Sequence, residues 1–368
     1  MLGVACGAAL ARRGRNVVLL ERHSQPGQET TARNSQVVHA GLYYPVGSLK
    51  AQMCVEGRER LYARCVEHGI PHRRIGKLVV ATCDDELQAL EGVLERAEAN
   101  GAGGMQWLAE SEVRAREPRV RAVAALWSPN TGIVDAHALA SSYQAEMETH
   151  DGTAIFNTQV VGLGRRGAGR GDSWLVETES VDGERFDLEV PCVINAAGLA
   201  SDGVAALAGL DVDGLGWRIK LCKGDYFGLA ASLGKLTHHL VYPVPAKAGL
   251  GIHVTVDLGG RYRLGPDAEY VDALTYHVDP SKAEKFAAAA ARYLPEVRPE
   301  HLQPEMAGIR PKLQGPGEAV RDFVIEESSE RGAPGLVNLI GIESPGLTAA
   351  GAIAERVAAL LDERGVFA

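Results

Sequence analysis

Apolar and polar positions follow helical and strand periods in turn along the chain. Leu2–Arg13 is rich in small apolar residues and predicts a helix that Gly14 ends, and the apolar run Val17–Leu20 predicts a strand that stops at Glu21. Val190–Asn195 predicts a second apolar strand, which leads through Ala-Ala-Gly into a helix. Strands that are apolar throughout and adjoin helices predict a parallel sheet.

The other periodic segments extend this pattern. Apolar residues at helical spacing predict an amphipathic helix over Thr82–Asn100. Short β-like runs separated by Pro and Gly predict an antiparallel sheet within residues 217–264. Further helices are expected at Ala136–Glu148, Ala283–Tyr293 and about Thr348–Glu363, and further strands at Ala154–Phe156, Trp174–Thr178 and Leu336–Ile340, with a Gly/Arg-rich turn at 164–171 joining the first two of these strands.

This order of elements predicts an α/β protein with two domains. A Rossmann-type nucleotide domain is expected to comprise residues 1–75, 131–210 and 320–368. An inserted, mainly antiparallel substrate domain is expected to comprise 76–130 and 211–319. The chain has 368 residues, 46% of them hydrophobic, which is enough to bury a large core.

Composition narrows the classes of function. The net charge is -9 and the basic residues are scattered, which argues against nucleic acid as a partner and means that an anionic substrate needs a local cationic pocket. The six cysteines form no CxxC pair and no zinc-like spacing with histidine, so we expect neither a metal site nor a disulfide framework. The sequence lacks a run of about 18 apolar residues, so no transmembrane segment is expected.

The first helix and strand match the second half of a dinucleotide-binding unit. In such a unit, glycines let the backbone approach the pyrophosphate, and an acid about 20 residues further on binds the ribose hydroxyls. Gly3 stands where the third glycine belongs, and Glu21 lies 18 residues after it. The first strand and the first two glycines are missing, and our hypothesis is that the start has been cut or mis-assigned. An ordinary helix and strand ending in a solvated glutamate would give the same pattern.

Residues 29–45 concentrate hydroxyl, Arg, Asn, His and Tyr side chains, which core strands do not do: Glu-Thr-Thr-Ala-Arg-Asn-Ser-Gln-Val-Val-His-Ala-Gly-Leu-Tyr-Tyr-Pro. This segment resembles the flavin-proximal loop of the D-amino-acid-oxidase superfamily, and in detail that of the L-2-hydroxyglutarate dehydrogenases. The resemblance continues in motifs along nearly the whole chain: Gly47–Lys50, Thr131–Asp135, Asn195–Gly198, Lys223–Tyr226, Tyr242–Pro245, Ala307–Lys312 and Gly341–Thr348.

The resemblance implies an FAD-binding domain of the D-amino-acid-oxidase type. FAD is then the expected cofactor, and the final helix points with its partly positive N-terminus at the pyrimidine edge of the flavin, where it stabilises negative charge on the reduced ring. Ordinary capping of a C-terminal helix is compatible with the same residues. The residues expected to bind the cofactor are Gly3, Glu21, Thr31, Arg33, Asn34, Ser35, Ala197, Gly198, Gly346, Leu347 and Thr348.

Oxidation of a hydroxy acid by a flavin needs a base that takes the hydroxyl proton while hydride moves to flavin N5. His39 is the first candidate, because the resemblance places its loop against the isoalloxazine ring. His253, on an expected strand that faces the substrate, is the rival base. Either histidine has a packing role as its alternative reading.

A dicarboxylate needs cationic donors, and Arg310 with Lys312 is the best candidate clamp. Pro311 stiffens the backbone between the two side chains. A surface charge pair is the alternative interpretation. The hydroxyl groups of Tyr43, Tyr44 and Tyr242 are expected to contribute further to substrate binding.

Together these features predict oxidation of L-2-hydroxyglutarate, or a closely related small anionic 2-hydroxy acid, to 2-oxoglutarate. By resemblance, the electrons leave for a quinone or oxygen rather than NAD, and the protein is expected in the cytoplasm or on the inner face of a membrane. Two alternatives stay open. One is an amine or amino-acid oxidase of the same superfamily, and the other is a truncated, non-catalytic fragment unable to hold FAD.

Overall fold

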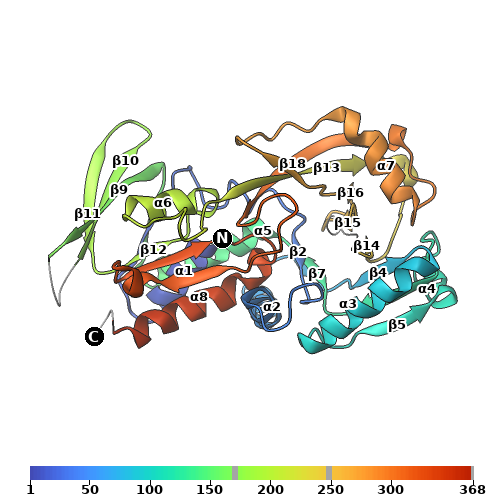
Figure 1. Ribbon diagram of the computed structural model, residues 1–368, viewed down its shortest axis with the longest axis horizontal. Coiled ribbons are helices and arrows are strands. Elements are labelled where there is room, and N and C mark those ends of the chain that lie inside the picture. The colour runs from blue at the N-terminus through green and yellow to red at the C-terminus, as the bar shows by residue number, and fades with distance from the viewer. Residues whose placement is uncertain (168–172, 246–250, 366–368) are drawn as a thin grey trace. The chain divides into compact units, whose positions relative to one another are not determined.

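The computed structural model describes residues 1–167, 173–245 and 251–365 and divides into two compact units (Figure 1). Unit 1 comprises residues 1–32, 136–220 and 311–368, and unit 2 comprises 33–135 and 221–310. The sequence-based boundaries differ from this division chiefly at residues 33–75, which group with unit 2. Which unit serves the nucleotide and which the substrate stays a prediction.

Unit 1 consists of helices, parallel strand pairs and a three-stranded antiparallel sheet. Its helices are α1 (Leu2–Ala11), α5 (Ala136–Thr149), α6 (Ser201–Leu207) and α8 (Gly346–Glu363). Its strands are β1 (Val18–Leu20), β8 (Thr153–Ile155), β9 (Thr158–Arg166), β10 (Ser173–Ser180), β11 (Arg185–Val190), β12 (Val193–Asn195), β19 (Val324–Glu327) and β20 (Leu336–Ile340).

The parallel strands of unit 1 form two separate ladders within the described residues. Strand β1 pairs with β8, and β12 pairs with β20, which carries β19 antiparallel on its other side. Helix α1 packs against both α5 and α8. The expected helices and parallel pairing are therefore present, although the strands do not join into one sheet.

Two strand assignments made from the sequence were wrong in detail. Strand β8 pairs with β1 and not with β10, because the antiparallel partner of β10 is β9. The expected turn at 164–171 therefore begins too early, since Gly164–Arg166 belong to β9, and its residues 168–171 lie outside the described residues. Val190 ends β11 and is separated from β12 by Pro191 and Cys192, so the expected strand 190–195 is divided between two strands.

Unit 2 is built on a mixed sheet. Its helices are α2 (Leu49–Glu67), α3 (Leu87–Ala99), α4 (Glu110–Arg116) and α7 (Ala283–Ala291). Its strands are β2 (Val37–Val38), β3 (His72–Arg73), β4 (Lys77–Ala81), β5 (Gln106–Ala109), β6 (Ala124–Ser128), β7 (Gly132–Val134), β14 (Leu240–Pro243), β15 (Val254–Val256), β16 (Tyr262–Leu264) and β17 (Glu269–Val271), and strands β13 (Lys220–Leu229) and β18 (Leu302–Lys312) each cross a unit boundary.

The large sheet of unit 2 has the order β17-β13-β16-β15-β14-β4-β6-β5, with β18 pairing β13. It is mostly antiparallel, as expected, although β14 and β4 run parallel. Strand β4 is buried at every position, and its residues contribute to apolar clusters on both faces of the sheet. Strands β2, β7 and β3 form a small second sheet. Its strand β2 ends at Val38, directly before the loop that carries His39. Helix α2 was not anticipated from the sequence.

Close helix packing in unit 1 depends on Gly7 of α1. A Cβ atom at Gly7 would lie 2.6 Å from Sδ of Met147 in α5 and 3.6 Å from Cγ1 of Val17. At the end of α1, Arg12 bonds Glu146 of α5 at 2.7 Å and Glu355 of α8, and Arg13 bonds the same Glu355. The glycine thus sets the approach of the helices, and the arginines connect their solvent-facing edges.

We expect Gly7→Val to lower the free energy of unfolding by about 1–3 kcal/mol, because the side chain would overpack the α1–α5 contact. Gly92→Val is the matched control, since a Cβ at Gly92 of α3 meets nothing within 4 Å. Chemical denaturation of both variants measures the difference. Equal midpoints would show that α1 and α5 do not pack this closely.

Candidate active site

The loop that carries His39 is held by side chains that donate to its backbone carbonyl groups. Cys54 and Arg58 of α2 approach the carbonyls of His39 and Ala40 at 3.5 and 3.3 Å. Nδ2 of Asn100, the C-cap of α3, donates to the carbonyls of Gly41 and Tyr44 at 3.0 and 2.9 Å. Four carbonyls of one short loop are thereby satisfied without a strand partner.

His39 itself is half-buried and lies in a positive electrostatic environment. The pKa of His39 is lowered to about 3. The main cause is the loss of contact with water, and the positive charge of Lys77 and the proximity of His253 add to it. An imidazole with this pKa is uncharged throughout the neutral range and keeps a nitrogen lone pair that can accept a proton. The two predicted bases, His39 and His253, are thus close enough to interact electrostatically.

Lys77 is the functional candidate that the sequence analysis missed. It is the first residue of β4 and is 0% exposed. Burial lowers its pKa to about 7. Its Nζ lies 4.6 Å from the ring centroid of Tyr43 and 4.6 Å from that of Tyr242. A lysine that opens an otherwise apolar run, Gly-Lys-Leu-Val-Val-Ala, is the signal that could have revealed it.

Tyr242 joins this lysine to the second histidine. The rings of Tyr242 and His253 stack with centroids 3.8 Å apart and planes inclined by 11°. Both residues are buried, at 1% and 5% exposure. The structure therefore brings His39, Tyr43, Tyr242 and His253 together around Lys77. Tyr44 contributes a carbonyl to the loop anchor described above.

Arg310 lies on β18 beside the start of β13. Its guanidinium donates to the carbonyl of Asp267, and a Cβ at Gly224 would lie 2.6 Å from its Nη2. Glycine at 224 therefore leaves the space in which the guanidinium lies. Burial raises the pKa of nearby Tyr226, while Ser35 and the charge of Arg310 oppose the shift. Within the described part of the chain, the guanidinium makes no further hydrogen bond, so its other N–H groups remain available.

The Arg-Asn-Ser motif is ordered by local contacts within unit 2. Oδ1 of Asn34 accepts from the backbone N–H of Gln36 at 2.7 Å. The Ser35 hydroxyl lies 3.0 Å from Oη of Tyr226, and the Arg33 guanidinium stacks 4.2 Å above the ring of Tyr276. These three residues were expected to bind the cofactor, and that role stays a prediction.

Lys312 and Arg310 both belong to β18, but they are assigned to different units. It belongs to unit 1, where its Nζ lies 3.1 Å from Oε1 of Glu343, a carboxylate that is 8% exposed. Its charge is therefore already matched by an acid of the loop before α8. A joint role of Lys312 and Arg310 as a clamp stays a prediction.

In unit 1, the start of α1 lies beside β1 and beside the residue that follows β12. A Cβ at Gly3 would lie 3.2 Å from Cδ1 of Leu19 in β1 and 3.7 Å from Cβ of Ala196, directly after β12. Glu21 follows β1, and its carboxylate accepts from the backbone N–H of His23 at 3.0 Å. This is the position at which open α/β sheets bind nucleotides.

The Asn195–Gly198 turn is fixed by buried amides. Nδ2 of Asn195 donates to Oδ1 of Asn338 in β20 at 2.8 Å, and Asn338 in turn donates to the Ser328 hydroxyl at 3.0 Å. Oδ1 of Asn195 accepts from the N–H of Ala197 at 3.4 Å, and Gly198 has a φ of 57°. The turn is thereby attached to the neighbouring strand.

The remaining cofactor candidates lie at Thr31 and at the first turn of α8. The Thr31 methyl group would lie 3.2 Å from a Cβ at Gly27, whose φ is 81°, so it packs inside its own loop. Helix α8 begins at Gly346, so Gly346, Leu347 and Thr348 are its first residues, and Thr348 is 1% exposed. The partly positive end of an 18-residue helix is thus formed by the predicted residues.

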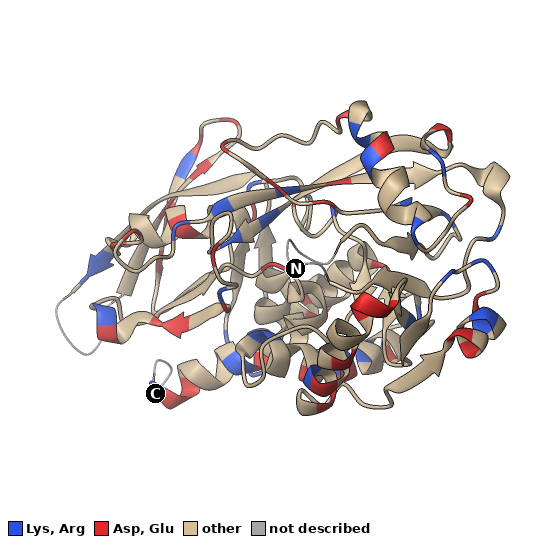
Figure 2. Cartoon of the chain, turned by 45° about the vertical axis from the view of Figure 1, so that its right-hand side comes forward, with Lys and Arg blue, Asp and Glu red and all other residues tan. Residues whose placement is uncertain are grey.

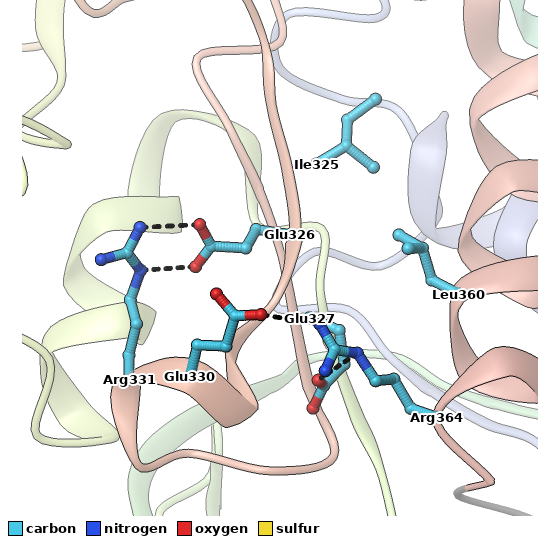
Figure 3. Close-up of a pocket in the computed structure, with 7 residues that line it drawn as sticks. All are labelled: Ile325, Glu326, Glu327, Glu330, Arg331, Leu360 and Arg364. Atoms are coloured by element: carbon cyan, nitrogen blue, oxygen red, sulfur yellow. Dashed lines mark hydrogen bonds and ion pairs between the residues drawn. The ribbon is translucent and has the colours of Figure 1, made fainter.

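A surface pocket of about 250 Å³ in unit 1 is a poor alternative site (Figure 3). Arg331 donates to both carboxylate oxygens of Glu326, and Arg364 lies 3.2 Å from Glu330. The charged side chains that line the pocket therefore neutralise one another. Leu360, which lines it, is about 21 Å along α8 from Gly346 at 1.5 Å per residue. None of the predicted site residues lines this pocket.

Neither the distribution of charged residues nor a group of metal ligands indicates a second site among the described residues. Basic and acidic residues alternate along the helices and strands of the chain (Figure 2). Among the described residues, no three His, Cys, Asp or Glu side chains are grouped as metal ligands. No described helix combines the length and apolarity that crossing a membrane requires.

Comparison with known proteins identifies relatives over nearly the whole chain. Residues 1–360 match the profile of the DAO family, described as FAD dependent oxidoreductase. L-2-hydroxyglutarate dehydrogenase, mitochondrial, of Arabidopsis thaliana is 38% identical over 97% of this chain and 81% of its own length. L-2-hydroxyglutarate dehydrogenase of Escherichia coli K12 is 34% identical over 68% of this chain and 57% of its own length.

Solved structures confirm the predicted FAD-binding, D-amino-acid-oxidase-like fold. L-alpha-glycerophosphate oxidase of Mycoplasma pneumoniae, determined with FAD bound, superposes with a TM-score of 0.85 at 26% identity and covers 98% of this chain and 92% of that one. Glycine oxidase of Geobacillus kaustophilus superposes with a TM-score of 0.77 at 20% identity, covering 98% and 92%, a likeness of fold alone.

We expect Asn100→Asp to release the His39 loop, because a carboxylate cannot donate to the carbonyls of Gly41 and Tyr44. The pKa of His39, followed by NMR of labelled histidine, should rise from about 3 towards its ordinary 6.5 as the ring becomes solvated. The free energy of unfolding should fall by about 1–3 kcal/mol.

Asn130→Asp is the matched control for this experiment. Nδ2 of Asn130 also donates to two carbonyls, those of Ala102 and Gly103, at 3.0 Å each, but this turn carries no site residue. It should lose similar stability and leave the His39 pKa unchanged. If both variants moved the pKa of His39 equally, the special role of Asn100 would be refuted.

Proposed function

The chain belongs to the family of FAD dependent oxidoreductases, and on this basis we propose that it oxidises L-2-hydroxyglutarate, or a closely related 2-hydroxy acid, to the 2-oxo acid. The names of the Arabidopsis thaliana and Escherichia coli relatives support this substrate. The observation that carries the proposal is the uncharged, half-buried His39 beside the buried cation Lys77, an arrangement suited to a hydroxy acid that must lose a proton.

The proposed FAD site uses residues of unit 1 that match the second half of a dinucleotide-binding unit. Gly3 lies where a Cβ would approach Leu19 and Ala196, and Glu21 follows β1 at the ribose position. Ala197 and Gly198 form the turn after β12, and Gly346, Leu347 and Thr348 begin α8. We assign cofactor binding to these residues. We assign it also to Thr31, Arg33, Asn34 and Ser35, which lie in the loop between β1 and β2. Bound FAD supplies the acceptor for the hydride.

His39 is the proposed base. Its neutral imidazole accepts the proton of the substrate hydroxyl, and the nearby positive charge of Lys77 disfavours the protonated ring before substrate binds. A pKa of about 3 makes the free imidazole a weak base, so the negative charge of the bound substrate has to raise this pKa before the hydroxyl proton is taken. His253, stacked on Tyr242, has little freedom to move towards a substrate and is assigned the secondary role of supporting the Tyr242 ring.

Arg310 is the proposed anchor for one substrate carboxylate. A guanidinium with unoccupied N–H groups can hold a carboxylate through two parallel hydrogen bonds. The hydroxyls of Tyr43, Tyr44 and Tyr242 add uncharged donors, and Lys312 adds a cation from unit 1. The proposed electron acceptor is a quinone or oxygen, and a quinone acceptor would place the protein at the inner face of a membrane instead of free in the cytoplasm.

We expect L-2-hydroxyglutarate to bleach the visible absorption of the FAD-loaded protein under anaerobic conditions, because electrons from the substrate carbon reduce the flavin. The D enantiomer and amino acids such as glycine should leave the spectrum unchanged. Bleaching by an amino acid, with none by the hydroxy acid, would instead identify an amino-acid oxidase. A protein that stays colourless after FAD is added would contradict the proposal altogether.

We expect His39→Gln to slow flavin reduction by about 10²–10⁴-fold, because the amide cannot take the hydroxyl proton. Substrate affinity, measured at equilibrium with the unreactive analogue glutarate, should change little. His72→Gln is the control, since Nδ1 of His72 lies 2.8 Å from the carbonyl of Ile70, which is not part of the loop that carries His39. Unchanged reduction in His39→Gln would transfer the base assignment to another residue.

A further inference from the structure

We propose that Lys77 and the hydroxyl of Tyr43 form a buried anion subsite that holds one substrate carboxylate, while Arg310 holds the other. Unit 2 would then select dianions by binding them at two points. This inference deepens the proposed function and takes the class of ligand from it. The subsite itself is argued from the contacts of Lys77.

Lys77 presents three N–H donors in a place where the protein provides no acceptor. Its side chain is 0% exposed, and no hydrogen bond to Nζ is made by any residue in the described ranges. Its strand neighbours are Leu240 of β14 and Ser128 of β6. An ammonium group in such surroundings is strongly destabilising unless an anion or another acceptor reaches it.

Tyr43 supplies a second unmatched donor beside the first. Its hydroxyl is buried and also lacks a hydrogen-bond partner among the described residues, and its ring lies 4.6 Å from the lysine nitrogen. A carboxylate has two oxygen atoms and can accept from an ammonium and a phenol together. The pair therefore suits a carboxylate better than a water molecule, which would have to donate as well as accept.

Two other lysines of unit 2 with little exposure, Lys282 and Lys223, have acidic partners. Nζ of Lys282 lies 2.5 Å from Asp225 and 2.6 Å from Glu269, and Nζ of Lys223 lies 2.9 Å from Asp225. By contrast, Lys77 has no ion pair with any acid in the part of the chain that the structure describes. Lys77 thus lacks the counter-charge that Lys282 and Lys223 have, and a dianionic substrate would supply it.

The subsite also has a defined dependence on pH. The titratable groups facing Lys77 are Cys54 of α2, His39 and Tyr43 of the loop, Tyr242 of β14, and His253. Burial raises the pKa of Cys54 to about 12 and those of both tyrosines further above their ordinary values, and His39 is uncharged near neutrality. Lys77, with a pKa of about 7, is then half charged at neutral pH, and a bound carboxylate raises that pKa.

The test is calorimetric titration of the FAD-loaded protein with glutarate, which has two carboxylates, and with butyrate, which has one. At pH 8, glutarate binding should take up close to one proton, detected by comparing buffers with different ionisation enthalpies, because Lys77 becomes charged on binding. At pH 6 the uptake should be much smaller. Glutarate should bind more tightly than butyrate.

Lys77→Met should weaken glutarate binding on the order of 10²-fold, abolish the proton uptake at pH 8 and largely remove the preference over butyrate. Lys285→Met is the matched control, because it removes the same charge from an exposed position, at 65% side-chain exposure. Unchanged glutarate binding and proton uptake in Lys77→Met would overturn the proposal.

Tyr43→Phe provides an independent variant that keeps the ring. It should weaken glutarate binding about tenfold, by the loss of one hydrogen bond to a charged group. Full retention of glutarate affinity would remove Tyr43 from the subsite and overturn the proposal in its stated form.

Stability separates a binding role from a structural one. The pKa of Lys77 in the folded protein, about 7, lies below its ordinary 10.5, so between these values the unfolded chain binds the extra proton and the lysine opposes folding. Lys77→Met should therefore raise the unfolding midpoint at pH 7.5 by several degrees, and this gain should shrink as the pH approaches 10.5. A lower midpoint would indicate that Lys77 is a structural residue.

Binding and turnover can fail independently in these experiments. If L-2-hydroxyglutarate does not reduce the flavin but Lys77→Met still abolishes glutarate binding, the anion subsite stands and the proposed reaction fails. If L-2-hydroxyglutarate reduces the flavin but Lys77→Met binds glutarate as tightly as the unmodified protein, the reaction stands and the subsite fails.

Discussion

A peptide carbonyl inside a protein needs a hydrogen-bond donor, and this requirement governs the loop that carries His39. The loop leaves the short strand β2 and continues without a strand partner, so its donors come from side chains of α2 and from Asn100 after α3. Helix α3 is in turn packed on the buried sheet through a cluster that includes Leu90 and Val93, and Leu42 of the loop belongs to the same cluster. The position of the candidate base is therefore set by helix packing some distance along the chain.

The regular elements of the fold were largely predictable because they are repeated patterns. Strand β20 and helices α1, α5 and α8 follow from apolar periodicity, and most of them begin and end within two residues of their expected limits. Pairing was harder, because nothing local distinguishes β9 from β8 as the partner of β10. Motifs placed His39 and Arg310 in a candidate site, whereas Lys77 was missed because burial of a single charge on an apolar strand is a tertiary property.

The two units differ in how their cationic side chains are paired with acids, and composition alone could not show this difference. The chain carries a net charge of -9, yet unit 2 buries Lys77 without an acid among the described residues and keeps N–H groups of Arg310 available. In unit 1, Lys312 and the arginines at the end of α1 are matched with carboxylates. Uncompensated positive charge is thus local, which allows an acidic protein to bind an acidic ligand.

The division of the chain has a consequence for biosynthesis. Each unit is assembled from separated segments, with chain crossings after residues 32, 135, 220 and 310. Strand β12 finds its neighbour β20 only once residues 336–340 have been made, and the same holds for α1 and its late neighbour α8. The side of α1 that packs against α8 therefore stays uncovered until residues 346–363 have been translated. Apolar surface that is exposed during synthesis favours aggregation and the binding of chaperones.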